Sequence, residues 1–257
     1  IATGTYYKMD YSAGVDISRY RNIPVPTSYM AIKSGYDFVG GYENDTRAGV
    51  LHVANHHISP GKKQWTWGNG DFGVAWDRNL TDADGPYIEL RTEVYTDNQP
   101  DFTWLQPYEE KTFTQYFMPY RELGVVKNAS KDLLLNVDSE GDDLVVKVFA
   151  TSSQPRVKIN LIANGQTILG ETTDLSPEKV YEKRVPAPGV EADGIRLEIA
   201  DNATGNILLS WQGVPDTIPE APEPARAAKA PADIMTTEEL FLTGQHIEQY
   251  RHATYDP

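Results

Sequence analysis

The chain has 257 residues, of which 40% are apolar and 23% are charged, so wholesale disorder is excluded and one large or two ordinary domains can form. Its net charge of −14 argues against a nucleic-acid groove or a surface for anionic membranes, because both require basic patches. No run approaches the roughly 18 apolar residues that a membrane-spanning helix needs.

Residues 1–127 are predicted to form a β-rich domain. Segments such as GPYIELRTEVYTD and EKTFTQYFMPY are rich in aromatic and β-branched residues, and Pro, Gly and Asp bound them. Helical periodicity is not evident in this region. The sequence starts with neither an initiator Met nor a signal-peptide pattern, so we expect a processed or excised piece of a longer protein.

Residues 128–213 are predicted to form a small immunoglobulin-like β-sandwich. Short strand patterns follow one another at intervals of roughly ten residues, with turn signals between them. One of these signals is Asn164 followed by Gly165, which is typical of a tight hairpin turn. The region contains no histidine and few aromatic residues, so we expect an accessory module.

Residues 214–235 are rich in Pro and Ala, which indicates an extended linker, and residues 236–257 are predicted to be a helix. Thr236 and Glu239 have capping-box spacing at the start of this helix. A single amphipathic helix cannot bury its own apolar stripe, so it either docks on the sandwich or begins a truncated helical-repeat region. The apolar side chains that we expect to pack against protein are Leu240, Phe241 and Ile247.

Long motifs between Asp37 and Tyr120 satisfy no general folding rule: DFVGGYE, HVANHHISPGKKQWTWG, WDRNLTDADGPYIEL and YTDNQPDFTWLQPYEEKTFTQYFMPY. Through these motifs the chain resembles an uncharacterised bacterial domain family, a domain of unknown function with a galactose-mutarotase-like β-supersandwich. The segment TTEELFLTGQHIEQYRHATYDP resembles the opening of the tetratricopeptide-repeat array in the same large proteins.

The resemblance implies a mainly β fold, with the C-terminal part of a galactose-mutarotase-like antiparallel supersandwich in residues 1–127, then the immunoglobulin-like sandwich and the C-terminal helix. A complete supersandwich is usually larger, so we expect residues 1–127 to be incomplete. The resemblance also implies a carbohydrate substrate, although a fold alone does not give a reaction. We therefore expect a saccharide ligand, protein partners bound through helical repeats, and a periplasmic or extracellular rather than cytoplasmic location.

Histidines and carboxylates in these motifs are candidates for acid–base chemistry. Strand alternation would place His52, Ala54 and His56 on one face, and a histidine beside a carboxylate can transfer protons near neutral pH. The alternative is that each histidine is a satisfied core or surface residue. The catalytic candidates are His52, His56, Asp77, Glu89 and Asp97.

No metal or other cofactor is expected. The adjacent residues His56 and His57 would point to opposite sides of a strand, which is a poor spacing for shared coordination. The chain has no cysteine, so it lacks disulfides and thiol nucleophiles, and it suits oxidising and reducing compartments alike.

Tryptophans in the same motifs are candidates for sugar recognition. Trp65 and Trp67 are two residues apart and share a face of an extended segment. Indole rings stack on the CH faces of sugars while amides and carboxylates bind the hydroxyl groups. The alternative, that tryptophans fill the core, is favoured for Trp76 and Trp104. The predicted substrate-binding residues are Trp65, Trp67, Asn69, Asn98 and Asp101.

Glu89 and Glu93 share a strand face with Arg91 between them. Four residues along a strand separate their backbones by roughly 13 Å, which exceeds the roughly 5–9.5 Å carboxylate spacing of glycosidases. A charge-compensated face is therefore the more common explanation, and a catalytic partner would have to come from another loop. The candidates for that partner are Asp77, Asp97 and Asp101.

Two functions from different classes are compatible with these patterns. The first is a glycoside hydrolase or sugar epimerase-like enzyme that uses His and Glu/Asp beside an aromatic platform. The second is a non-catalytic carbohydrate-binding and scaffold module. An enzyme needs two titratable groups that converge on the aromatic pocket, whereas a binding module needs only the platform and hydrogen-bonding groups.

Overall fold

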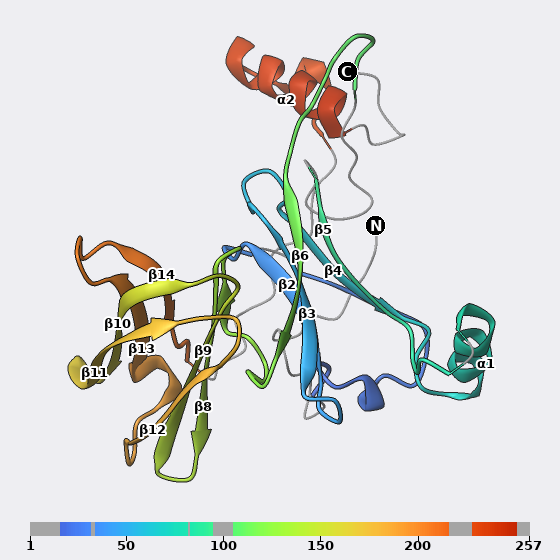
Figure 1. Ribbon diagram of the computed structural model, residues 1–257. Helices are drawn as coiled ribbons and strands as arrows, with labels where there is room; N and C mark the ends of the chain where they lie inside the picture. Colours follow the sequence, from blue (N-terminus) through green and yellow to red (C-terminus); the bar gives the residue numbers. More distant parts are fainter. Residues whose placement is uncertain (1–15, 32–33, 82, 95–104, 216–227, 251–257) are drawn as a thin grey trace. The chain divides into compact units, whose positions relative to one another are not determined.

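The computed structural model describes residues 16–31, 34–81, 83–94, 105–215 and 228–250 (Figure 1). The chain divides into two compact units. The first unit consists of Ile1–Ser34, His57–Thr114 and Ile218–Pro257, and the second consists of Gly35–His56 and Gln115–Thr217.

The second unit contains a sandwich of two antiparallel four-stranded sheets. One sheet has the strand order β12-β9-β8-β7 and the other has the order β11-β10-β13-β14. This division of strands is that of immunoglobulin-like domains. Strands β8, β9 and β12 correspond to A, B and E of one sheet, and strands β10, β13 and β14 correspond to C, F and G of the other. The elements are β7 (Asn128–Ala129), β8 (Leu133–Glu140), β9 (Asp143–Ala150), β10 (Gln154–Ala163), β11 (Gln166–Leu175), β12 (Tyr181–Pro186), η2 (Ala192–Gly194), β13 (Ile195–Asp201) and β14 (Ile207–Gln212).

Strand alternation builds the core between these sheets. On β10 the side chains of Val157, Ile159 and Leu161 are buried, while Lys158 between them is exposed. Each fully buried aliphatic side chain contributes about 1.5–3 kcal/mol to folding, so the sandwich core is the main source of stability in this unit. The other core residues are Leu133, Leu135, Val137, Leu144, Val146, Val148, Ala150, Leu175, Val185, Ile195, Leu197, Ile199 and Leu209.

The predicted hairpin turn is confirmed between β10 and β11. Ala163 pairs with Gln166, and both Asn164 (φ 49°) and Gly165 (φ 80°) lie in the left-handed region that such a two-residue turn requires.

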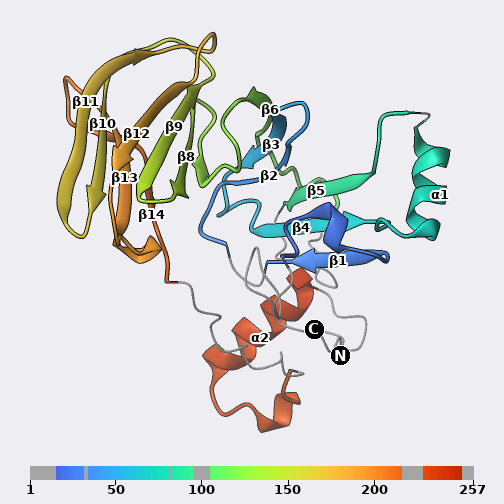
Figure 2. The same ribbon diagram turned by 90° about the horizontal axis from the view of Figure 1, so that it is seen from below.

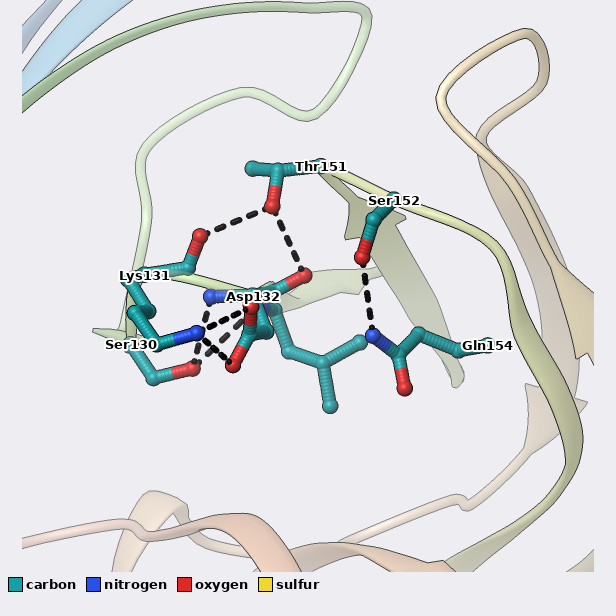
Figure 3. Close-up of polar contacts among 7 residues, drawn as sticks. Ser130, Lys131, Asp132, Thr151, Ser152 and Gln154 are labelled. Atoms are coloured by element: carbon teal, nitrogen blue, oxygen red, sulfur yellow. Dashed lines mark hydrogen bonds and ion pairs between the residues drawn. The ribbon is translucent and has the colours of Figure 1, made fainter.

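Polar groups fix the chain where β8 begins and β9 ends (Figure 3). The Thr151 hydroxyl donates to the Lys131 carbonyl at 2.7 Å, and the Ser130 hydroxyl accepts the backbone N–H of Asp132 at 3.2 Å. Lys131 pairs with the carboxylate of its neighbour Asp132 at 2.8 Å. These bonds satisfy backbone groups that the ladder leaves unpaired at the strand ends.

A three-stranded antiparallel sheet, in the order β2-β3-β6, packs on the outer face of the β12-β9-β8-β7 sheet. Its strands are β2 (Phe38–Glu43), β3 (Ala48–Ala54) and β6 (Gln115–Arg121). Leu51 and Tyr120 from this sheet share a buried cluster with Leu134 and Phe149 from the sandwich. Strands β8 and β9 are therefore covered on both faces, and the second unit has three layers of sheet (Figure 2).

Close contact between rings and a glycine fixes the register of this sheet. A Cβ atom on Gly49 would lie 2.5 Å from the Tyr120 ring, so only glycine fits opposite that side chain. The ring of Tyr42 stacks on Tyr120 at 5.8 Å. Burial raises the pKa of Tyr120 far above its usual value.

The first unit contains a second three-stranded antiparallel sheet, in the order β1-β4-β5, and a helix. The elements are η1 (Tyr20–Asn22), β1 (Thr27–Met30), β4 (Gly61–Thr66), α1 (Asp71–Leu80) and β5 (Ile88–Glu93). Helix α1 corrects the expectation that the region before residue 128 lacks helical periodicity. Its apolar residues Phe72, Trp76 and Leu80 do recur at intervals of four, but the segment is too short to stand out from the surrounding strand patterns.

The C-terminal helix α2 (Thr237–Tyr250) follows η3 (Pro231–Asp233). The Thr236 hydroxyl accepts the Glu239 backbone N–H at 3.1 Å, as the capping-box spacing predicts. The apolar stripe differs from expectation, because Leu240 is 42% exposed and Phe241 is 65% exposed. Only Ile247 of the three expected contact residues is half-buried.

The expected fold class is confirmed as mainly β, with antiparallel sheets, an immunoglobulin-like sandwich and a C-terminal helix. Residues 35–56 and 115–127 lie before the boundary predicted at residue 128, and they pack in the same compact unit as the sandwich. Much of the predicted linker over residues 214–235 lies outside the described residues.

Replacing Leu197 by Ala should lower the free energy of unfolding of the sandwich by about 2–5 kcal/mol, because the side chain is fully buried between the sheets. The control is Leu208→Ala on the adjacent strand, where the side chain is exposed and the change should stay within about 0.5 kcal/mol. Urea denaturation measures both. Equal losses from the two variants would contradict the assigned core.

Candidate functional site

Aromatic rings gather on one face of the β1-β4-β5 sheet and on helix α1. The ring centroids of Trp65 and Trp67 are 4.4 Å apart, with an interplanar angle of 81°. Trp67 stacks face to face on Trp76 of α1 at 4.7 Å and 7°. Phe72 lies edge-on to both Trp67 and Trp76, at 6.0 and 6.4 Å. We call Trp65, Trp67, Phe72, Trp76 and Tyr87 the aromatic surface.

Backbone contacts hold α1 where Trp76 can reach Trp67. The Asn69 and Gly70 N–H groups donate to the carbonyls of Ile23 and Pro24, which fixes the chain just before the helix. A Cβ atom on Gly73 would lie 1.8 Å from the Gly68 carbonyl oxygen, so glycine is needed for the first turn to approach this loop. Close approach of the first turn is therefore a condition for the tryptophan stack.

Exposure distinguishes the rings that can meet a ligand from those that support them. Phe72 is 57% exposed and Trp76 is 39% exposed, whereas Trp65 and Trp67 are half-buried. One face of Trp67 is covered by Trp76. Trp76, for which the sequence favoured a core role, thus offers more ring surface than the predicted platform residue Trp67.

Charged side chains lie on the same face of the sheet. Trp65 is directly opposite Glu89 in the ladder, and Lys63 is opposite Arg91, so these four residues share one face. Arg91 forms ion pairs with Glu89 at 3.6 Å and Glu93 at 3.9 Å. This is the charge-compensated arrangement that the sequence favoured over a catalytic carboxylate pair.

Tyr87 connects the aromatic and charged parts of this face. Its ring lies 6.2 Å from Trp65, and its hydroxyl donates to Glu89 Oε1 at 3.1 Å. Desolvation and the hydrogen bond to the Glu89 carboxylate raise the pKa of Tyr87, while Arg91 acts in the opposite direction. The hydroxyl therefore remains a hydrogen-bond donor at neutral pH.

Asp77 and Asn69 make structural contacts on α1 and the loop before it. Asp77 is only 9% exposed, and its Oδ1 accepts the Tyr87 backbone N–H at 3.1 Å. The Tyr20 hydroxyl lies 3.4 Å from Asp77 Oδ2 and 2.9 Å from the Gly68 carbonyl. Asn69 Nδ2 donates to the Tyr20 carbonyl at 3.0 Å. These bonds connect η1, α1 and the start of β5.

His52 and His56 belong to the second unit. His52 is buried on β3, and its ring stacks on Phe117 at 4.4 Å. Strand β3 ends at Ala54, so His56 lies in the following turn and not on the strand face that alternation predicted. There His56 Nδ1 lies 2.6 Å from Asp37 Oδ1, which also accepts the His56 backbone N–H at 2.8 Å.

The structure thus brings Trp65, Trp67 and Glu89 together on one sheet face and connects Asp77 to them through Tyr87. His52 and His56 form local contacts within the other compact unit. Three predicted site residues lie outside the described residues: Asp97, Asn98 and Asp101. Trp104, one of the two tryptophans for which a core role is favoured, also lies outside them.

Sequence reasoning missed several contributors. Phe72 could have been found from its spacing of four residues from Trp76, and Tyr87 from its alternation with Glu89. Asp37 pairs with His56 across 19 residues, and Tyr20 approaches Asp77 across 57, so no local pattern signals either contact.

A pocket of about 510 Å³ in the second unit is lined in part by Tyr116, Lys131, Phe149 and Thr151. Its polar groups are already engaged, because Lys131 pairs with Asp132 and Thr151 bonds backbone carbonyls (Figure 3). Within the described ranges, no three potential metal ligands lie close enough together to hold an ion. Neither α-helix of the described chain has the length and apolar character required to cross a bilayer.

Fold and site together define a two-unit, antiparallel β protein with an exposed aromatic and charged surface. Residues 6–120 match the family model of a domain of unknown function, DUF5107, and residues 128–211 match that of the second domain of YphG-like proteins. The expected resemblance to an uncharacterised domain family is therefore confirmed over residues 6–120. No solved structure matches the chain significantly.

Replacing Trp67 by Ala should loosen α1, because it removes the ring on which Trp76 stacks. Hydrogen exchange of the α1 amides should accelerate by at least about tenfold, which corresponds to about 1.4 kcal/mol of local stability. Amides of β8 and β9 serve as the internal control and should not change. Unchanged exchange in α1 would show that the stack does not hold the helix.

Proposed function

We propose that this chain belongs to a carbohydrate-active protein and that its first unit binds saccharides on the aromatic surface. The observation that supports the proposal most directly is the exposed pair Phe72 and Trp76, which is continuous through Trp67 and Trp65 with the polar groups of Tyr87 and Glu89.

The chemistry of this surface suits sugar rings. An indole or phenyl face packs against the apolar CH groups of a pyranose, and each such contact removes apolar area from water. Carboxylates accept hydrogen bonds from hydroxyl groups, and the Arg91 guanidinium donates to hydroxyl oxygens. Arg91 and Glu89 are both partly exposed, so a ligand can reach them without breaking the fold.

Binding does not require any of these groups to change protonation state. Glu89 forms an ion pair with Arg91 and accepts a hydrogen bond from the Tyr87 hydroxyl. A binding module is thus the function that the geometry of the first unit supports best. In this proposal the protein acts in the periplasm or outside the cell, where polysaccharides are accessible.

The exposed residues Leu240 and Phe241 of α2 support a related proposal, that this helix begins a helical-repeat array that recruits protein partners.

A second candidate function is catalytic, and the contact between His56 and Asp37 favours it. A carboxylate 2.6 Å from Nδ1 fixes the orientation of the imidazole. Such a pair can serve as the acid–base component of a glycoside hydrolase or an epimerase-like enzyme. In this alternative His56 transfers the proton and Asp37 is a positioning residue.

Replacing Trp76 by Ala should weaken binding of a recognised oligosaccharide by at least about tenfold, or 1.4 kcal/mol, because the exposed stacking face is lost. Isothermal titration calorimetry with soluble glucan, xylan and mannan oligosaccharides measures the effect. Phe241→Ala is the matched control, since it removes an exposed ring from α2 and should leave affinity unchanged. Binding that survives Trp76→Ala would exclude the aromatic surface.

Replacing His56 by Ala should reduce glycoside turnover by about a hundredfold if the catalytic alternative holds, and Asp37→Asn should also lower the rate, because it weakens the contact that orients the imidazole. The assay uses p-nitrophenyl glycosides and the natural protein that contains this sequence. His57→Ala is the control for changes in the same turn. Turnover that is unaffected by His56→Ala would remove His56 from the mechanism.

A further inference from the structure

A pocket of about 370 Å³ lies in the first unit beside helix α1. Its volume is within the range of roughly 300–1,000 Å³ that small-molecule sites occupy. Its lining includes Tyr20, Asn69, Val74, Asp77, Arg78 and Pro86. The proposed oligosaccharide surface does not account for this pocket.

The pocket lies on a different side of α1 from the aromatic surface. At 100° per residue, Phe72, Trp76 and Leu80 form one stripe of the helix. Three residues of the pocket also belong to this helix: Val74, Asp77 and Arg78. Around the helix axis, their mean direction is about 150° from the mean direction of the stripe. One helix therefore presents two surfaces that point in different directions.

Asp77 has acceptor capacity that the protein does not use. Its Oδ1 is bonded by the Tyr87 N–H at 3.1 Å. Its Oδ2 has one hydrogen-bonding partner within the described residues, the Tyr20 hydroxyl at 3.4 Å. That hydroxyl has a single proton and a nearer acceptor, the Gly68 carbonyl at 2.9 Å. A side chain that is nine-tenths buried thus presents an oxygen without a full-strength donor at the pocket.

Arg78 supplies the complementary group. It is exposed, lines the same pocket, and makes no ion pair with any residue that the structure describes. A carboxylate and a guanidinium on consecutive residues offer acceptors and donors together and compensate each other's charge. Vicinal hydroxyl groups of a neutral ligand can donate to the carboxylate and accept from the guanidinium. The aliphatic side chains of Val74 and Pro86 form an apolar part of the pocket wall, against which the CH groups of a ligand can pack.

Burial and the neighbouring Asp77 carboxylate raise the pKa of Tyr20, so its hydroxyl stays protonated across the neutral range. A ligand hydroxyl that bonds Asp77 Oδ2 would leave the Tyr20 proton with the Gly68 carbonyl. Ligand binding then completes the hydrogen bonding of Asp77 without breaking a strong bond in the protein.

We propose that this pocket is a second, independent ligand site, which binds one neutral polyhydroxylated ring of monosaccharide size through Asp77 and Arg78. The site does not require the aromatic surface, so it can exist even if oligosaccharides do not bind there.

The test is a titration of isotope-labelled protein with D-glucose, D-galactose and D-mannose in separate experiments. At least one sugar should produce saturable shifts of the Tyr87 amide and the Arg78 Nε–H signal, with a Kd on the order of 1 mM. Arg78→Gln should weaken this binding by at least tenfold while leaving the rest of the spectrum intact. Asp77→Asn should also weaken it, because an amide retains an acceptor for Tyr87 but loses the negative charge.

One control variant makes the outcome decisive. Arg21→Gln removes an exposed arginine outside the pocket, and it should not change monosaccharide affinity. The proposal is overturned if no sugar gives saturable shifts at Tyr87, or if Arg78→Gln binds as well as the unmodified protein. Shifts of the Trp65 and Trp76 indole N–H signals without a shift of the Arg78 Nε–H signal would assign the sugar to the aromatic surface instead, which would support the proposed function and reject the second site.

Discussion

The face-to-face contact between Trp67 and Trp76 is the interaction on which the functional account depends. It joins helix α1 to the end of strand β4, and it decides which aromatic faces remain exposed. An aromatic pair of this kind adds about 0.5–1.5 kcal/mol beyond its area burial, so it can position a short helix without making it rigid. The aromatic surface and the pocket beside Asp77 both take their geometry from the placement of this helix.

Sequence patterns predict most clearly those elements whose conformation is determined by residues close together in the sequence. The sandwich strands alternate buried and exposed residues, and Asn164 with Gly165 defines its own turn. Helix α1 was missed because its ten residues include Gly73 and because its stability comes from contacts with Trp67 and the Gly68 loop. Tertiary contacts, rather than propensity, determine the conformation of that segment.

The candidate site was predicted only in part, for the same reason. Trp65, Trp67 and Glu89 share a face by strand alternation, and the ladder confirms this arrangement. The exposed position of Trp76, the bond from Tyr87 to Asp77 and the pairing of His56 with Asp37 all depend on long-range packing. The change in sequence character at residue 128 likewise gives no sign that β2, β3 and β6 cover the sandwich. That layer is held by apolar contacts between residues distant in the sequence, in which Leu51 and Tyr120 are buried against Leu134 and Phe149.

The most direct test of saccharide recognition is to follow the indole N–H signals of the tryptophans while soluble oligosaccharides are added to labelled protein. The account predicts that at least one oligosaccharide shifts the signals of Trp76 and Trp65 together with the Arg91 side chain, and that sandwich signals such as Trp211 do not move. Shifts confined to the sandwich, or none with any oligosaccharide tested, would contradict it.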